Sequence, residues 1–226
     1  MKYISVAIDG PSGAGKSTMA KRLAAELGYV YVDTGAMYRA VGLYIMRKGI
    51  NLEDKETIIG ELPEIMVTIG YENGTQHVYL NNEDVSSLIR TEEVGKYAST
   101  CSAIPEVRAH LLELQRNMGR TNNIIMDGRD IGTVVLPDAT VKIFLVASLE
   151  KRAQRRYDEL IAKGEKVTYE ETYKQMEQRD YADMNRAVAP LKPAEDSVHA
   201  DTSDLGLEEA YALLKNIIME KTKDVL

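Results

Sequence analysis

The sequence predicts an α/β fold in which helices wrap a parallel sheet and a small antiparallel sheet is inserted. Short apolar segments alternate with segments of helical periodicity along most of the chain, an order typical of a parallel sheet covered by helices. The segment 10–17 fits the phosphate-loop (P-loop) pattern G-x-x-x-x-G-K-[ST] and lies between an apolar strand and a helix, as that loop requires. Residues 66–84 interrupt the alternation with the pattern of a hairpin, which predicts the insertion.

Strands and helices are expected in turn along the chain. Short apolar runs predict strands at 3–8, 29–32, 123–126, 141–146 and 197–200. Helical periodicity predicts helices at 16–27, 36–48, 86–97, 105–118, 148–163, 168–182 and 207–221. Gly28 is a typical stop for the first helix, and Pro105 is a typical first residue of another. Ser148 is a good N-cap residue type, and Thr168 with Glu171 forms a capping box.

Two turns mark the inserted hairpin. Residues 66–71 and 77–80 have the composition of strands, and Asn73-Gly74 between them is a strong signal for a tight turn. Asn81-Asn82 predicts a second turn, with a further strand through Val85. A hairpin within an otherwise alternating chain indicates an inserted lobe.

Composition and charge exclude several classes of protein. The formal net charge is −7, and 44% of the residues are hydrophobic and 28% charged, as in ordinary globular domains and unlike most nucleic-acid-binding proteins. We therefore expect no nucleic-acid polymer as partner, and no membrane either, because no run approaches the roughly 18 apolar residues of a membrane span. The single cysteine, Cys101, fits a reducing compartment, so we expect a cytoplasmic location. A cleaved leader would remove the P-loop, and none is expected.

The P-loop is the first candidate site. Its glycines let the backbone turn N–H groups around a phosphate, and the following helix adds unpaired N–H groups and its positive dipole end. Lys16 can reach the outer phosphates of a nucleotide, and the Ser17 hydroxyl can hold Mg²⁺. The residues predicted to bind ATP are Gly10, Pro11, Ser12, Gly13, Ala14, Gly15, Lys16, Ser17 and Thr18. The alternative is a glycine-rich turn that matches the pattern by chance.

Two further motifs follow predicted strands, at the edge where open α/β sheets bind ligands. In DTGAMYR, Thr34 and Arg39 place a hydroxyl and a guanidinium near a helix start. In DGRDIGT, Asp127 can be interpreted as an acid near Mg²⁺, and Arg129 and Asp130 follow it. A helix cap with a surface arginine would explain the first motif, and a strand-end turn would explain the glycines of the second.

Arginines recur on one face of two predicted helices. Arg152, Arg155 and Arg156 share a face, and like charges at this spacing repel unless an anion lies against them. The next helix has the spacing i, i+4 and i+7 in Arg179, Asp183 and Arg186. The alternatives are a solvated charged face for the first set and an exposed salt-bridge ladder for the second.

Together these motifs fit the transfer of a phosphoryl group between two phosphorylated molecules. Two polyanions repel each other unless cations screen them, and phosphoryl transfer depends on positioning and electrostatic stabilisation. Lys16, Mg²⁺ and several arginines suit both tasks. A phosphate acceptor is largely dianionic at neutral pH and needs no general base, so a nucleoside monophosphate fits better than a hydroxyl acceptor.

The motifs resemble those of the bacterial cytidylate kinase family over essentially the whole chain. The matching segments are IDGPSGAGKS from Ile8, DTGAMYR from Asp33, DGRDIGT from Asp127 and NRAVAPL from Asn185. The resemblance implies transfer of the γ-phosphoryl group of ATP to CMP or dCMP within a single domain, 1–226. It further implies a core (1–60, 86–150 and 185–226), an inserted monophosphate-binding lobe (about 61–85) and a mobile helical lid (about 151–184).

The same resemblance implies a role for each candidate residue. It places the acceptor phosphate at Arg39, Arg129 and Arg186, and the cytosine base at Ser99, Arg108 and Asp130. It places the ribose at Arg179 and Asp183 and includes Thr34 in the CMP site. It also implies that a lid helix closes over the ATP phosphates with Arg152, Arg155 and Arg156. The residues expected to act in catalysis are Lys16, Arg129, Arg152, Arg155, Arg156 and Arg186.

Selectivity for cytosine has a physical rationale. Cytosine presents an amino donor beside a ring acceptor, and uracil reverses both, so a carboxylate at Asp130 with Arg108 would leave UMP with an unmet polar contact. The alternatives are a P-loop kinase for another small acceptor, such as UMP or AMP, and a GTP-dependent regulatory binding module, which would normally have an N-K-x-D motif. A monomer is expected, because lid and lobe must move during turnover.

Overall fold

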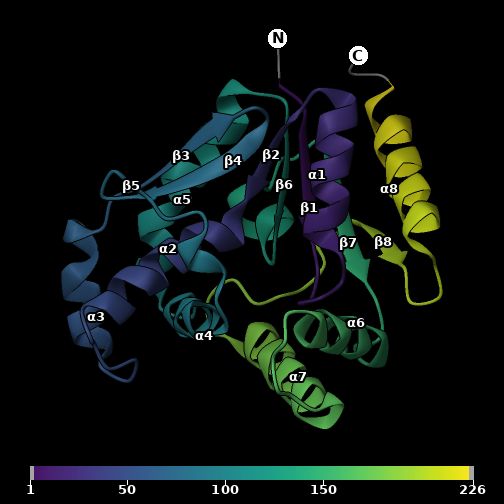
Figure 1. The fold of residues 1–226 in the computed structure, drawn as a ribbon. Coiled ribbons are helices and arrows are strands. Elements are labelled where there is room, and N and C mark those ends of the chain that lie inside the picture. Colours follow the sequence, from purple (N-terminus) through teal and green to yellow (C-terminus); the bar gives the residue numbers. More distant parts are fainter. Residues whose placement is uncertain (1–2, 224–226) are drawn as a thin grey trace.

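The computed structural model describes residues 3–223 and contains a five-stranded parallel sheet (Figure 1). Its strands are β1 (Ser5–Asp9), β2 (Val30–Asp33), β6 (Ile124–Gly128), β7 (Val141–Val146) and β8 (Val198–Asp201), in the order β2-β6-β1-β7-β8. Every neighbouring pair runs parallel. The first strand of the chain is therefore the central one, and the loop that follows it leaves the middle of the sheet.

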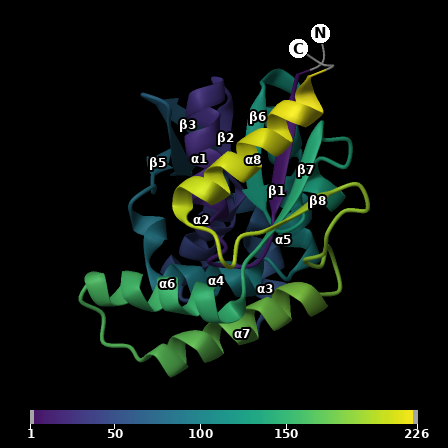
Figure 2. The ribbon, with the colours of Figure 1, turned by 90° about the vertical axis from the view of Figure 1, so that its right-hand side faces the viewer.

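Helices cover both faces of this sheet, because successive side chains of a strand point to opposite sides. On one face, Val6 and Ile8 share a core with α1 (Lys16–Leu27) and α8 (Leu207–Thr222). On the other, Ala7 shares a core with α2 (Thr34–Arg47), α4 (Glu92–Cys101) and α5 (Pro105–Thr121). Helices α6 (Leu149–Ala162) and α7 (Tyr169–Asn185) lie side by side across the carboxyl ends of the strands (Figures 1 and 2).

The predicted insertion is a three-stranded antiparallel sheet of β3 (Val67–Glu72), β4 (Thr75–Leu80) and β5 (Glu83–Asp84). Asn73 and Gly74 form its first turn with φ angles of 50° and 75°, the left-handed pair that a tight two-residue hairpin turn needs. Val78 and Leu80 of β4 are buried in the core on the α2 side. The fold class predicted from the sequence is confirmed.

Two expectations about helices were wrong. The predicted helix 86–97 is a 3₁₀ turn, Leu88–Arg90, followed by α4, because Thr91 is extended and its side chain accepts a hydrogen bond from Val94 N at 3.3 Å. That cap starts the helix at Glu92. Helix α3 (Lys55–Glu61) was not expected from the sequence, although Asp54 caps it by accepting from Thr57 N at 3.0 Å.

The division into core, lobe and lid remains a prediction from the sequence. The small sheet and helices α2, α4 and α5 share one hydrophobic core, in which Cys101 is fully buried, as expected for a small apolar side chain. None of the helices within residues 3–223 is both long and apolar enough to cross a membrane.

Candidate active site

A cavity of about 560 Å³ lies at the carboxyl edge of the sheet, between the P-loop, α2, α4, α5 and the α6–α7 pair. Motifs that are far apart in the sequence meet there. The predicted site residues that line it are Ser12, Gly13, Gly15, Lys16, Ser17, Thr18, Thr34, Arg39, Ser99, Arg108, Arg129, Asp130, Arg155, Arg156, Arg179, Asp183 and Arg186. Parallel strands bring their carboxyl ends to one edge, which explains this convergence.

Glycines in the P-loop are required by close contacts at two positions. A Cβ on Gly10, whose φ is +151°, would lie 2.0 Å from the Leu145 carbonyl oxygen of β7. A Cβ on Gly13, whose φ is +74°, would lie 2.8 Å from Met176 Cε of α7. Any other residue would be strained at both φ angles, and at Gly10 it would also clash with backbone that cannot move aside. The loop is therefore packed between the sheet and α7.

Lys16 begins α1 and is only 5% exposed. Its Nζ donates a hydrogen bond to the Pro11 carbonyl oxygen at 2.7 Å. Burial and the neighbouring Arg129 guanidinium hold the pKa of Lys16 well below its usual range. A buried cation gains most from an anionic partner, so the amine is suited to phosphate oxygens that enter the cavity.

Ser17 and Asp127 form the second part of the P-loop site. Ser17 Oγ donates to Asp127 Oδ2 at 2.8 Å, and Tyr31 Oη donates to Asp127 Oδ1 at 2.8 Å. Burial raises the pKa of Asp127 to about 6, with the nearby Asp33 carboxylate contributing. Within residues 3–223, no group of three His, Cys, Asp or Glu side chains could hold a metal ion. A hydroxyl and one carboxylate are hard oxygen ligands of the kind Mg²⁺ takes together with substrate phosphates.

We expect Asp127→Asn to raise the free energy of unfolding at neutral pH by about 1–2 kcal/mol. The pKa of Asp127 is higher in the folded protein than its usual value, so the folded state binds the proton more tightly. The carboxylate therefore opposes folding increasingly as the pH rises from about 4 to about 6, and the penalty stays constant at higher pH. Denaturant unfolding at about pH 5 and about pH 7.5 should show the larger gain at the higher pH. An equal or negative difference at both values would contradict this.

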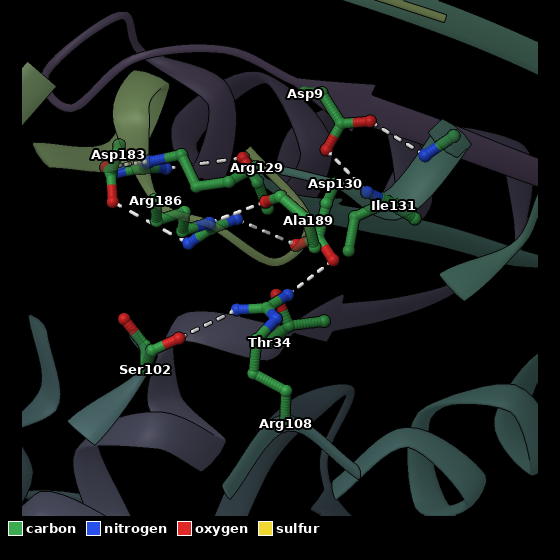
Figure 3. A network of polar contacts seen from close by, with 12 residues as sticks. Asp9, Thr34, Ser102, Arg108, Arg129, Asp130, Ile131, Asp183, Arg186 and Ala189 are labelled. Carbon is green, nitrogen blue, oxygen red and sulfur yellow. Dashed lines mark hydrogen bonds and ion pairs between the residues drawn. The ribbon is translucent and has the colours of Figure 1, made fainter. Parts of the chain in front are cut away.

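The base-reading candidates form a buried ion-paired group (Figure 3). Arg108 Nη2 contacts Asp130 Oδ2, and Arg108 Nη1 donates to the Ser102 carbonyl oxygen at 3.2 Å. The other Asp130 oxygen lies 3.4 Å from Arg186 Nη2. The Arg108 guanidinium also lies over the Tyr38 ring, 5.3 Å from its centroid. These contacts fix a carboxylate and a guanidinium side by side, and a carboxylate has lone pairs for a further donor.

Several guanidinium groups converge between this ion-paired group and the P-loop. Arg129 Nε donates to Asp183 Oδ2 at 2.9 Å, and Arg186 Nη1 lies 3.7 Å from Asp183 Oδ1. Arg179 Nε is buried and has no hydrogen-bond partner among the described residues. Burial and the Arg129 charge lower the pKa of Arg179 to about 10. Two carboxylates, Asp130 and Asp183, do not neutralise the guanidinium groups around them, which favours an anionic ligand.

Arg39 and Arg90 complete the cationic lining on the α2 side. Arg39 Nη1 donates to the Ile89 and Thr91 carbonyl oxygens at 3.0 and 3.2 Å. Arg90 lines the same cavity and its Nη1 lies 3.0 Å from Asp33 Oδ2. Arg90 was not predicted as a site residue, because it lies inside an expected helix and belongs to no motif.

Two predicted residues on α6 lie at the mouth of the cavity. Arg155 and Arg156 line it, and Arg156 also pairs with Glu92 at the start of α4 and with Glu159 at 2.6 Å. The α6 helix thus contacts α4 across the cavity.

Arg152 is placed differently from its two neighbours in the sequence. It is 5% exposed, and its guanidinium donates to the Ser12 and Ala147 carbonyl oxygens at 3.0 and 2.8 Å. It also pairs with Asp180 of α7, Nη1 to Oδ2, at 2.7 Å. The three arginines therefore have different surroundings. Arg155 and Arg156 line the cavity, whereas Arg152 connects the P-loop to α7. Three other residues predicted to bind ATP are also buried and are not among those that line the cavity. They are Gly10, Pro11 and Ala14 of the P-loop.

We expect Arg152→Met alone to destabilise the protein by about 3–5 kcal/mol, because it leaves the Asp180 carboxylate buried without its partner. The double variant Arg152→Met/Asp180→Leu should regain most of that stability, since apolar pairs commonly replace buried ion pairs at little cost. Thermal unfolding and steady-state kinetics of both variants test this. A stable double variant that has lost its turnover would instead indicate that Arg152 contacts ATP.

Comparisons with known proteins agree with the motifs. A family model described as Cytidylate kinase matches residues 6–220. A cytidylate kinase from Carboxydothermus hydrogenoformans is 49% identical over 223 residues, which cover 98% of this chain and 99% of that protein. A cytidylate kinase from Flavobacterium johnsoniae is 47% identical over 228 residues, covering 99% of each.

The fold is also found in a solved structure of distant sequence. The crystal structure of an uncharacterized protein from Eubacterium ventriosum aligns with a TM-score of 0.50 and 14% sequence identity, and the match covers 99% of each chain. At that identity the likeness concerns the fold alone.

Proposed function

The chain belongs to the cytidylate kinase family, and we propose that it transfers the γ-phosphoryl group of ATP to CMP or dCMP. It is a nucleoside monophosphate kinase, an ATP-dependent phosphotransferase. The observation that carries the substrate assignment is a single cavity that both the P-loop and the Arg108–Asp130 pair line. Arginines line the cavity between them.

The proposed reaction needs no proton acceptor from the protein. A phosphate oxygen of CMP attacks the γ-phosphorus of ATP, the bond from that phosphorus to the β–γ bridging oxygen breaks, and ADP leaves with the electron pair. Charge builds on the moving group and on both flanking oxygens. Lys16, Arg129, Arg155, Arg156 and Arg186 are the cations that would stabilise it. Their contribution is mainly electrostatic. All of them except Arg155 are already held by hydrogen bonds or ion pairs within the protein.

Mg²⁺ is part of this proposal. Ser17 and Asp127 would hold it, supported by their hydrogen bond of 2.8 Å and by the hard oxygen donors they offer. When bound, Mg²⁺ neutralises charge on the phosphate oxygens of ATP. The ATP site would further use the P-loop from Gly10 to Thr18, whose N–H groups favour a phosphate.

The acceptor site is proposed from the same geometry. Arg39, Arg129 and Arg186 would bind the phosphate of CMP, and Arg179 with Asp183 the ribose. Asp130 would accept a hydrogen bond from the cytosine amino group while Arg108 donates to the ring, with Ser99 and Thr34 close by in the lining. Ser102 lines the cavity as well, and its carbonyl oxygen holds Arg108.

A coupled assay of ADP release tests the proposal across CMP, dCMP, UMP, AMP and GMP. The highest kcat/KM is expected for CMP and dCMP. A preference for UMP or AMP would support the alternative acceptor considered from the sequence, and nucleotide binding without turnover would support the regulatory module, which the family membership does not favour. A cytoplasmic location and a monomeric state also belong to the proposal, and light scattering after size exclusion measures the latter.

A further inference from the structure

Asp9 links the P-loop strand to the turn that carries Arg129 and Asp130 (Figure 3). It is the last residue of β1, directly before Gly10, and is 5% exposed. Its Oδ1 accepts a hydrogen bond from Ile131 N at 2.8 Å, and its Oδ2 accepts one from Gly132 N at 2.7 Å. These two amides lie more than a hundred residues away along the chain. One buried side chain therefore holds two consecutive backbone N–H groups of another motif.

The turn needs this partner because of how it begins. Residues Ile131–Val135 form a single π-helical turn after Asp130, and the first N–H groups of any helix lack a partner inside it. The residue before a helix normally caps it with its own side chain, but Asp130 makes no such bond. Its carboxylate points instead to Arg108 and Arg186. Asp9 does the capping, which leaves the Asp130 carboxylate for the cavity.

The charge of Asp9 and its packing against the turn distinguish it from an apolar core residue. Burial raises the pKa of Asp9 to about 6, and the nearby Asp130 carboxylate acts in the same direction. The two backbone hydrogen bonds lower the pKa but do not offset the effect of burial. An apolar residue would avoid that cost. The turn packs directly on Asp9: a Cβ on Gly132 would lie at ordinary contact distance from Asp9 Oδ2, 3.4 Å. The strand register supports the same link, because Asp9 pairs with Gly128.

We propose that Asp9 is a positioning residue that fixes the Arg129–Asp130 turn relative to the P-loop and thereby sets the geometry of the acceptor site. The kinetic part of this inference rests on the proposed function, in which Asp130 reads the base. Asp9 touches neither substrate. Its effect reaches CMP through the backbone of the turn, whereas the P-loop keeps its own contacts.

Asp9→Asn tests the proposal with little change in shape. An amide can accept one of the two hydrogen bonds, but its NH₂ group faces the other N–H, so the turn loses its second anchor. We expect KM for CMP to rise about 10-fold and the CMP/UMP ratio of kcat/KM to fall, with KM for ATP changed less than about 2-fold. An equal rise in both KM values, or an unchanged CMP/UMP ratio, would overturn the proposal.

Two further variants separate positioning from loss of stability. Ile218→Ala removes a fully buried side chain of α8 in the core that also contains Ile8, away from the turn, and should lower stability without changing the CMP/UMP ratio. Asp9→Ser leaves one hydroxyl oxygen in place of the two carboxylate oxygens and removes the buried charge. We expect it to raise KM for CMP and to lower the CMP/UMP ratio as Asp9→Asn does, and it therefore tests the proposal if Asp9→Asn does not fold.

Hydrogen exchange provides a readout that does not depend on activity. The amides of Ile131 and Gly132 should exchange faster in Asp9→Asn than in the wild type, while the amides of α1 keep their protection. A wild-type protein that fails to phosphorylate CMP would refute the proposed function and leave this test valid. Unchanged exchange at Ile131 and Gly132 would refute the role of Asp9 even in an active enzyme.

Discussion

Replacing Lys16 by methionine is expected to lower kcat by about 10²–10³-fold, the typical loss when one fixed donor to a developing charge is removed. The same variant should be no less stable than the wild type at neutral pH. The pKa of Lys16 is lowered in the folded protein, so the unfolded chain binds the proton more tightly and the buried charge opposes folding. Methionine removes that charge and keeps most of the length of the side chain.

Kinetics, thermal unfolding and calorimetric titration with CMP check this expectation. CMP binding should persist, because the candidate acceptor site lies beyond the P-loop. Lys21→Met, an exposed lysine on the same helix, is the matched control and should keep wild-type turnover. A Lys16→Met enzyme with wild-type kcat would remove Lys16 from the ATP site.

Asp130→Asn is expected to narrow the preference for CMP over UMP by about 5- to 150-fold, the equivalent of one unmet buried polar contact of about 1–3 kcal/mol. The amide can turn a donor towards uracil, which the carboxylate cannot do. It also weakens the contacts with Arg108 and Arg186, so the variant should lose stability as well as activity on CMP.

The ratio of the two kcat/KM values is the measurement, because a smaller folded fraction lowers both values equally and cancels. Asp196→Asn is a suitable control, since Asp196 pairs with Lys142 at 2.8 Å and is not one of the residues that line the cavity. An unchanged CMP/UMP ratio in Asp130→Asn would refute base reading by this carboxylate.

Local sequence determined much of the fold. The alternating apolar runs located the five parallel strands to within one or two residues, and Asn73-Gly74 located the hairpin, because strand periodicity and turn chemistry are local properties. Helix starts were less predictable. Thr91 and Asp54 both cap helices, yet a threonine or aspartate caps only where its own backbone is non-helical and the next residues are helical, and that depends on packing.

The sequence by itself determined which residues gather at the cavity: the P-loop, the two strand-end motifs and most of the arginines came from motif and spacing. Tertiary structure alone decided what each guanidinium faces. Arg152 and Arg155 are three residues apart on one helix, yet one is buried against Asp180 and the other lines the cavity. Asp9 lies within a matching segment, but nothing in the sequence indicates its partners, which are amides over a hundred residues away. Spacing along a chain fixes the face of a helix, whereas the partner of a charge depends on which distant segments pack against that face.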